Sequence, residues 1–114
     1  MYNKEYRKSK RVRPSVKIEI VDIMSNSKIG DVLNISSEGL LVSCSCQITA
    51  GLLFQTQWNF SVRGFKSISV GLECLWSESQ TSNFFLTGFQ IIDISQDDQN
   101  ILDRIIAQSK EVVD

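Results

Sequence analysis

The sequence contains no histidine, and this absence excludes much of the common chemistry of enzymes. Neither a Ser-His-Asp triad nor a Cys-His pair can be assembled without it. Only three cysteines are present, Cys44, Cys46 and Cys74, and the odd number argues against a closed disulfide framework. A structural zinc site needs four Cys or His ligands. The sequence therefore predicts neither a catalytic residue nor a metal site, and we expect the cysteines to be buried or half-buried strand residues.

Long apolar runs are also lacking. No stretch approaches the roughly 18 residues that are needed to span a bilayer. The first residues are polar and basic, whereas a secretory signal has an apolar centre. We therefore expect a cytoplasmic protein that does not insert into a membrane. With 114 residues, the chain has the size of one domain and can bury a core without metal or disulfide support.

Positive charge is concentrated at one end of the chain, although the net charge is only −1. Seven of the twelve Lys and Arg residues lie within the first seventeen positions. A basic segment on a near-neutral body is typical of a localised anion-binding site. Residues 1–13 are also aperiodic, and we expect them to form a flexible arm that ends before Pro14, the single proline.

Apolar and polar residues alternate in six segments after this arm, which is the period of a β-strand. The segments are 16–20, 30–35, 40–46, 54–62, 68–76 and 84–92. Turn residues separate them at 24–28 and 36–39, a tight turn is expected at Arg63–Gly64, and a polar loop is expected over 77–82. Trp58 and Trp76 follow the alternation, so we expect them in the core or the barrel wall. Gly88 lies inside a segment, where glycine often marks a bulge or a close backbone approach.

The last part of the chain has a helical period. Ser95 precedes Asp98 by three residues, which resembles a capping box with Asp in place of Glu. Ile101, Leu102 and Ile105 then fall on one face of a helix expected from Gln96 to about Lys110. The sequence thus predicts an all-β fold, a six-stranded antiparallel barrel over residues 14–94, with a C-terminal helical region over 95–114.

Two short clusters could recognise a charged nucleotide. Arg7-Lys-Ser-Lys-Arg11 offers two guanidinium groups, which pair with phosphate, match the O6 and N7 edge of guanine and stack on bases. Asn34-Ile-Ser36-Ser-Glu-Gly39 offers an amide that can recognise a base edge, a hydroxyl and a flexible glycine. Each cluster alone also fits a simpler interpretation, the first as a solvated basic segment and the second as an ordinary β-turn.

In this order the two clusters resemble the PilZ domain family. The family pattern consists of an RxxxR arm, a strand, an [Asp/Asn]-x-Ser-x-x-Gly turn and a small barrel. The resemblance covers nearly the whole chain. Leu86-Thr-Gly88-Phe89 to Asp93, followed by Ser95-Gln-Asp-Asp98, resembles the last strand and helix of the family. The turn begins with Asn34, where the family accepts either Asp or Asn. The resemblance implies a six-stranded barrel that binds cyclic di-GMP.

The resemblance also implies roles for individual residues. Arg7 and Arg11 would contact phosphates and guanine edges, and Asn34 would hydrogen-bond a guanine. Ser36 would contact the phosphate or sugar region or hold the turn, and Gly39 would allow close backbone approach. Three additional candidates lie close to the two arginines in the sequence. Tyr6 precedes them, Lys10 lies between them and Arg13 follows them. The number of bound ligand molecules stays open, and no cofactor is implied.

We therefore expect a bacterial second-messenger receptor rather than an enzyme. Its arm would become ordered on the ligand and alter a surface for a downstream protein partner. One alternative is an adaptor of the same family that does not bind ligand and acts through protein–protein contacts. Another is a small barrel that binds RNA or single-stranded DNA, but the confined basic residues, the core period of the aromatics and a pI of about 5.4 argue against a nucleic-acid polymer.

Overall fold

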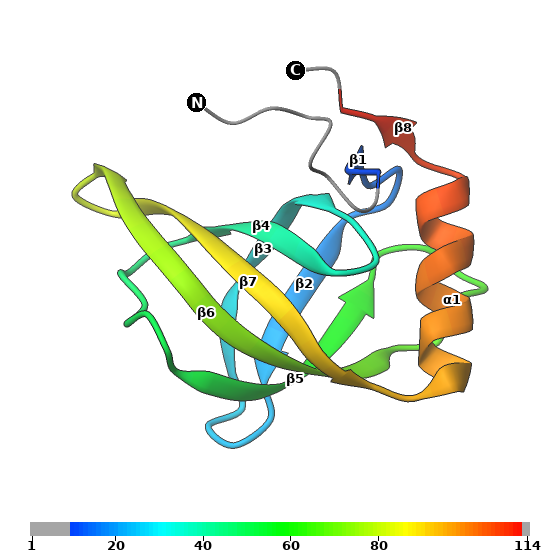
Figure 1. The fold of residues 1–114 in the computed structure, drawn as a ribbon, viewed down its shortest axis with the longest axis horizontal. Coiled ribbons are helices and arrows are strands. Elements are labelled where there is room, and N and C mark those ends of the chain that lie inside the picture. Colours follow the sequence, from blue (N-terminus) through cyan, green and yellow to red (C-terminus); the bar gives the residue numbers. More distant parts are fainter. Residues whose placement is uncertain (1–9, 113–114) are drawn as a thin grey trace.

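Six strands of the chain pair into a closed barrel. The computed structural model describes residues 10–112. The barrel strands are β2 (Ile18–Asp22), β3 (Ser27–Ile35), β4 (Gly39–Cys44), β5 (Leu53–Phe60), β6 (Ile68–Thr81) and β7 (Phe84–Ile94). They pair antiparallel in the order β2-β5-β6-β7-β4-β3, and β2 also pairs with β3, so the sheet closes on itself (Figure 1). The predicted six-stranded barrel is confirmed.

The core lies inside this barrel because successive strand residues point to opposite faces. Trp58 is fully buried, and its indole N–H donates to Thr56 Oγ1 at 3.0 Å, which satisfies the polar atom of an otherwise apolar side chain. Most of the other buried core residues are aliphatic side chains of β2 to β7. They include Ile18, Ile20, Ile35, Val42, Ile68, Val70 and Leu72.

Strands β6 and β7 form a long hairpin that extends past the barrel wall (Figure 1). The polar loop predicted over residues 77–82 is wrong, since β6 continues to Thr81 and the turn is confined to residues 82–83. The paired backbone of β7 keeps this stretch extended although its side chains are polar. Partner strands, rather than composition, therefore decide where β6 ends.

The connection between β5 and β6 is longer than the tight turn expected at Arg63–Gly64. It spans residues 61–67, with Gly64 at a φ of +96°. Phe65 folds back toward the barrel, where its ring lies 6.0 Å from that of Phe60 and 5.2 Å from the guanidinium carbon of Arg104. Packing of this one aromatic ring explains the wider loop.

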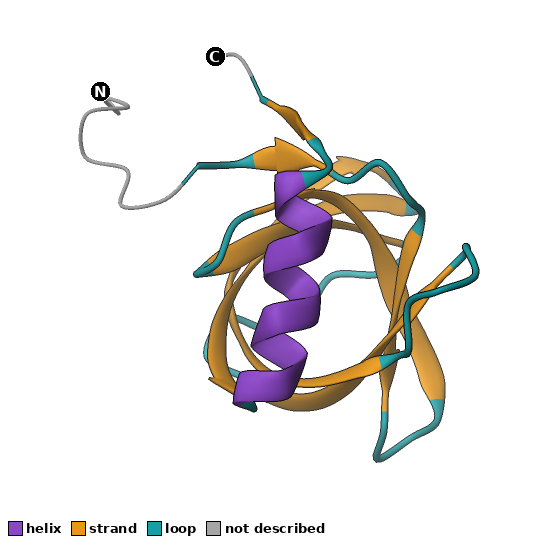
Figure 2. Cartoon of the chain, turned by 90° about the vertical axis from the view of Figure 1, so that its right-hand side faces the viewer, coloured by secondary structure: helices purple, strands orange, loops and turns teal. Residues whose placement is uncertain are grey.

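Helix α1 (Gln96–Ala107) lies across one end of the barrel (Figure 2). Leu102 and Ile105 are its buried residues. Ser95 caps the helix, and its Oγ accepts from Asp98 N–H at 3.1 Å, as predicted. The carboxylate of Asp98 accepts from Ser69 N–H at 3.0 Å, so it ties the first turn of the helix to β6.

The helix ends earlier than expected, and the chain then returns to the sheet. Ser109 Oγ donates to Ile105 O at 2.6 Å and accepts from Ser15 N–H at 3.1 Å. Lys110–Glu111 form the short strand β8, which pairs with β1 (Val12–Arg13), and β1 pairs in turn with β3. Val12, assigned to the arm from sequence, is therefore part of the sheet and is 3% exposed.

Candidate functional site

A hydrogen bond joins the two sequence clusters. Arg11 lies directly before β1 and is half-buried, and Asn34 lies near the end of β3. Arg11 Nη2 donates to Asn34 Oδ1 at 3.0 Å. Pairing of Val12 with Ile35 brings these strands together, although 23 residues separate Arg11 from Asn34. An arginine and an amide able to recognise guanine thus lie side by side.

A bulge turns the Asn34 side chain outward. Leu33 is the extra residue in β3, since the pairing with β4 shifts between Val32 and Asn34. Ile35 pairs with Leu40 and both side chains are buried, so the preceding residue, Asn34, must face the outside of the barrel. Its amide is therefore available to a ligand at the surface.

Ser36 holds the turn that follows. Its Oγ accepts from the N–H groups of Glu38 and Gly39, both at 3.2 Å, and its N–H donates to Gly39 O at 2.9 Å. Ser36 is 8% exposed. Of the two roles expected for this residue, the structure provides contacts for holding the turn.

Glycine is required at position 39 because the backbone of β7 lies very close to it. A Cβ at this position would lie 2.6 Å from the carbonyl oxygen of Phe89 on β7, which is closer than real Cβ contacts. Only glycine lets β4 start this close to β7. The expected close backbone approach thus exists within the barrel, independently of any ligand.

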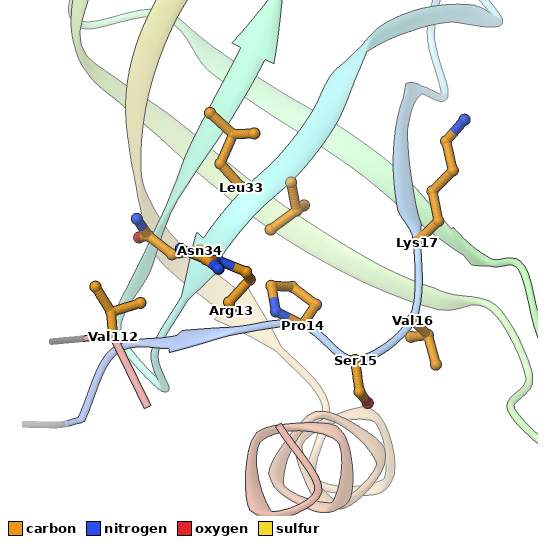
Figure 3. A pocket seen from close by; sticks show the side chains of 9 residues that line it. Arg13, Pro14, Ser15, Val16, Lys17, Leu33, Asn34 and Val112 are labelled. Atoms are coloured by element: carbon orange, nitrogen blue, oxygen red, sulfur yellow. The ribbon is translucent and has the colours of Figure 1, made fainter. Parts of the chain in front are cut away.

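An open groove of about 450 Å³ lies beside Asn34, between β3 and the segment that leads from β1 to β2 (Figure 3). Two exposed cations, Arg13 and Lys17, belong to its lining. Arg11 is anchored next to it on Asn34. The remaining lining residues are Pro14, Ser15, Val16, Val32, Leu33 and Val112. Positive charge at an open groove is suited to an anionic ligand.

A row of outward residues leads from Asn34 across the barrel. Asn34 pairs with Leu41, Leu41 with Gly88, and Gly88 with Trp76, on β3, β4, β7 and β6. We call these four residues the outer row. Neighbouring strands are about 4.8 Å apart, so the row spans roughly 14 Å. The scale is suited to a ligand with more than one base.

Trp76 closes the far end of the outer row. It is 43% exposed, and its indole packs over Gly88, where an added Cβ would collide with Nε1. An exposed indole on the outer face of a barrel can stack on a base. Sequence reasoning placed Trp76 in the core or the barrel wall and missed this candidate, because only the strand register sets it in line with Asn34.

The other candidates are less informative. Lys10 is exposed and lies 3.7 Å from the carboxylate of Glu111, which is a weak surface ion pair. Tyr6 and Arg7 lie outside the described residues. Within residues 10–112, no group of three or more potential ligands is arranged to hold a metal ion, and no helix is long and apolar enough to cross a membrane.

Two of the three cysteines are in the core. Cys44 and Cys74 are buried, and burial raises the pKa of both thiols, which makes them poor nucleophiles at neutral pH. Cys46 differs from the expectation because it is exposed, just beyond the end of β4.

Comparison with a family model gives a match over most of the chain. The model of the PilZ domain matches residues 5–108. No match was found among curated protein sequences.

Solved structures of the same fold share little sequence with this chain. The PilZ domain of YcgR from Escherichia coli, described with c-di-GMP, has a TM-score of 0.68 and 12% identity, and the match covers 91% of both chains. The inhibitor of motility MotI/DgrA from Bacillus subtilis has a TM-score of 0.69 and 15% identity, over 90% of this chain and 50% of that one. The MrkH–c-di-GMP complex from K. pneumonia has a TM-score of 0.69 and 13% identity, over 89% and 51%. The chain thus spans about half the length of MotI and MrkH.

Proposed function

The chain belongs to the PilZ domain family, and from this membership we propose that it is a receptor for cyclic di-GMP. The observation that supports this function best is the hydrogen bond between Arg11 and Asn34, which unites the two motifs. Three of the solved neighbours, the PilZ domain of YcgR, a second YcgR structure and MrkH, are described with this nucleotide. The outer face of this barrel carries an arginine and an amide that are suited to such a ligand.

Each part of the ligand has a complementary group in this proposal. The guanidinium of Arg11 has five N–H donors and uses one of them on Asn34, so others can pair with a phosphate or with the O6 and N7 edge of guanine. Asn34 retains its NH₂ donors for a base. Arg13 and Lys17 add positive charge at the groove, and Arg7 provides the second guanidinium of the motif.

Trp76 extends the binding face to the other end of the outer row. Because Gly88 has no side chain, the indole lies directly over it, and a guanine base could stack on the outer side of the indole. Ser36 and Gly39 act indirectly, since they fix the turn that starts β4 and therefore the register of Asn34 with Leu41.

Signalling in this proposal depends on the basic arm that precedes β1. The dianionic ligand draws Arg7 and its neighbours, with Tyr6 and Lys10, onto the outer row, and the new surface is read by a downstream protein. Ordering of a segment costs free energy, so a micromolar or somewhat tighter affinity is expected. No catalytic step is part of this function.

Isothermal titration calorimetry with cyclic di-GMP tests the proposal. The intact chain is compared with Arg7→Ala and Arg11→Ala, and Lys66→Ala serves as the control, because it removes one exposed charge from the β5–β6 loop. We expect binding by the intact chain and by Lys66→Ala, and at least a tenfold weaker affinity for each arginine variant, as for a lost charge-assisted contact of about 1.5–3 kcal/mol. Absence of heat with the intact chain, repeated by NMR titration, would instead indicate an adaptor that acts through protein contacts.

A further inference from the structure

The segment after the helix is hydrogen-bonded to Arg11 and to the strand that follows it, β1. Val112 N–H donates to Arg11 O at 2.9 Å, and the pairs Val12–Glu111 and Arg13–Lys110 continue the ladder. Ser109 Oγ accepts from Ser15 N–H at 3.1 Å, at the other end of the same stretch. These contacts bring residues about a hundred positions apart in the sequence to the edge of the candidate site.

Arg11 is therefore held from two sides. Its guanidinium contacts Asn34 on β3, and its carbonyl accepts from Val112 beyond β8. Strand β1 is only two residues long, and Val12 is its single buried side chain. Its pairing with β3 consists of the single pair Val12–Ile35, which is too short to fix an arginine backbone without further support. Strand β8 supplies that support on the free edge of β1.

From this arrangement we infer that residues 109–112 are a positioning element for Arg11, which they hold in register with Asn34 at the binding face. The inference rests on the proposed function where it concerns ligand affinity. It also makes a statement about the free protein, namely that the Arg11–Asn34 hydrogen bond depends on β8. Ligand binding would then favour the ordered state of residues 109–112, and order in these residues would favour ligand binding.

A matched pair of variants isolates the backbone contact. Val112→Pro removes the N–H that bonds to Arg11 O, whereas Val112→Thr keeps the N–H and the β-branched shape. Residue 112 lies outside the barrel core, so both variants are expected to have melting temperatures close to that of the unchanged chain. The difference between the two variants reports the loss of the hydrogen bond, with the change of side chain largely cancelled.

In the free protein, NMR of the Asn34 side-chain amide provides the first readout. Arg11→Ala defines the resonance position without the Arg11–Asn34 bond. We expect Val112→Pro to shift the resonance most of the way to that position and Val112→Thr to leave it near its original position. A resonance unchanged in Val112→Pro would overturn the inference. This result does not depend on ligand, so it stands apart from any failure of cyclic di-GMP to bind.

Ligand affinity provides the second readout. We expect Val112→Pro to bind cyclic di-GMP about three- to tenfold more weakly than Val112→Thr, the equivalent of one net hydrogen bond. In an Arg11→Lys background, which keeps a charge but lacks the planar fork, the two variants should differ by less than about twofold. An equal loss in both backgrounds would show that β8 acts on stability or on another residue, and would contradict a role through Arg11.

Discussion

Gly88 and Gly39 lie on neighbouring strands, yet an added methyl group would meet different neighbours at each. At Gly88 it would meet the indole of Trp76, a half-exposed side chain that can swing into solvent. At Gly39 it would meet the carbonyl of Phe89, which belongs to the paired backbone. The same substitution therefore separates a role in binding from a role in the fold.

For Gly88→Ala we expect displacement of the indole with little loss of stability. The free energy of unfolding should change by less than about 1 kcal/mol, because the side chain that must move is exposed. Iodide should quench more of the tryptophan fluorescence, since Trp58 is fully buried and only Trp76 can respond. The affinity for cyclic di-GMP should fall on the order of tenfold, the value of one lost base stack. Unchanged affinity would remove Trp76 from the site.

For Gly39→Ala we expect loss of stability instead. The strand start must move away from β7 to relieve the contact with Phe89 O, and overpacking of this kind costs about 1–3 kcal/mol. Urea unfolding measures the change, with Gly88→Ala as the matched control. A Gly39→Ala variant as stable as Gly88→Ala would mean that β4 can shift without cost.

Among the elements, helix α1 depends on Ser95, the residue that caps its start. The hydroxyl of Ser95 satisfies Asp98 N–H, one of the backbone donors that a helix start leaves without a partner. We expect Ser95→Ala to lower the free energy of unfolding by about 1 kcal/mol, and Ser95→Asn, which keeps a capping oxygen, to lower it much less. Thermal unfolding followed by circular dichroism compares the two. Equal losses would show that the capping oxygen is not the source of the stabilisation.

Local signals identified the start of this helix but not its end. The cap at Ser95 can be read from four consecutive residues. The end at Ala107 depends on Ser109, whose partners are Ile105 in the helix and Ser15 near the other end of the chain. Similarly, β6 extends through a polar stretch because β7 pairs with it. Contacts between distant residues decide element ends, and a single sequence does not contain them.

At the scale of the whole molecule, alternation predicted the barrel and the two motifs predicted that Arg11 and Asn34 would belong to one site. The structure brings these two side chains together. Trp76 was missed because its place in the outer row depends on bulges in β3 and β6 that shift the strand register. Sequence patterns therefore predict the fold and the motif residues, whereas the strand register determines which residues line the outer row between Asn34 and Trp76.

The charge distribution of the molecule predicts how binding responds to salt. A net charge of −1 gives no long-range attraction for a dianion, so the attraction must come from the local group of Arg11, Arg13, Lys17 and the basic arm. We expect affinity for cyclic di-GMP to fall as ionic strength rises from about 0.1 M to about 1 M, where the Debye length shortens from roughly 10 Å to 3 Å. Calorimetry across this range of ionic strength measures the change in affinity. An affinity independent of salt would mean that stacking and hydrogen bonds outweigh the charges.

The pairing of β1 with β8 has a mechanical consequence. The chain enters the sheet through Val12 and leaves it through Glu111, and these residues are direct partners in an antiparallel ladder. Tension applied to the two ends would open this ladder one pair at a time, which requires little force, before any load reached the closed barrel. When the domain is stretched within a longer assembly, Arg11 would therefore come loose from one side while the core stays folded, and pulling could weaken the site without unfolding the protein.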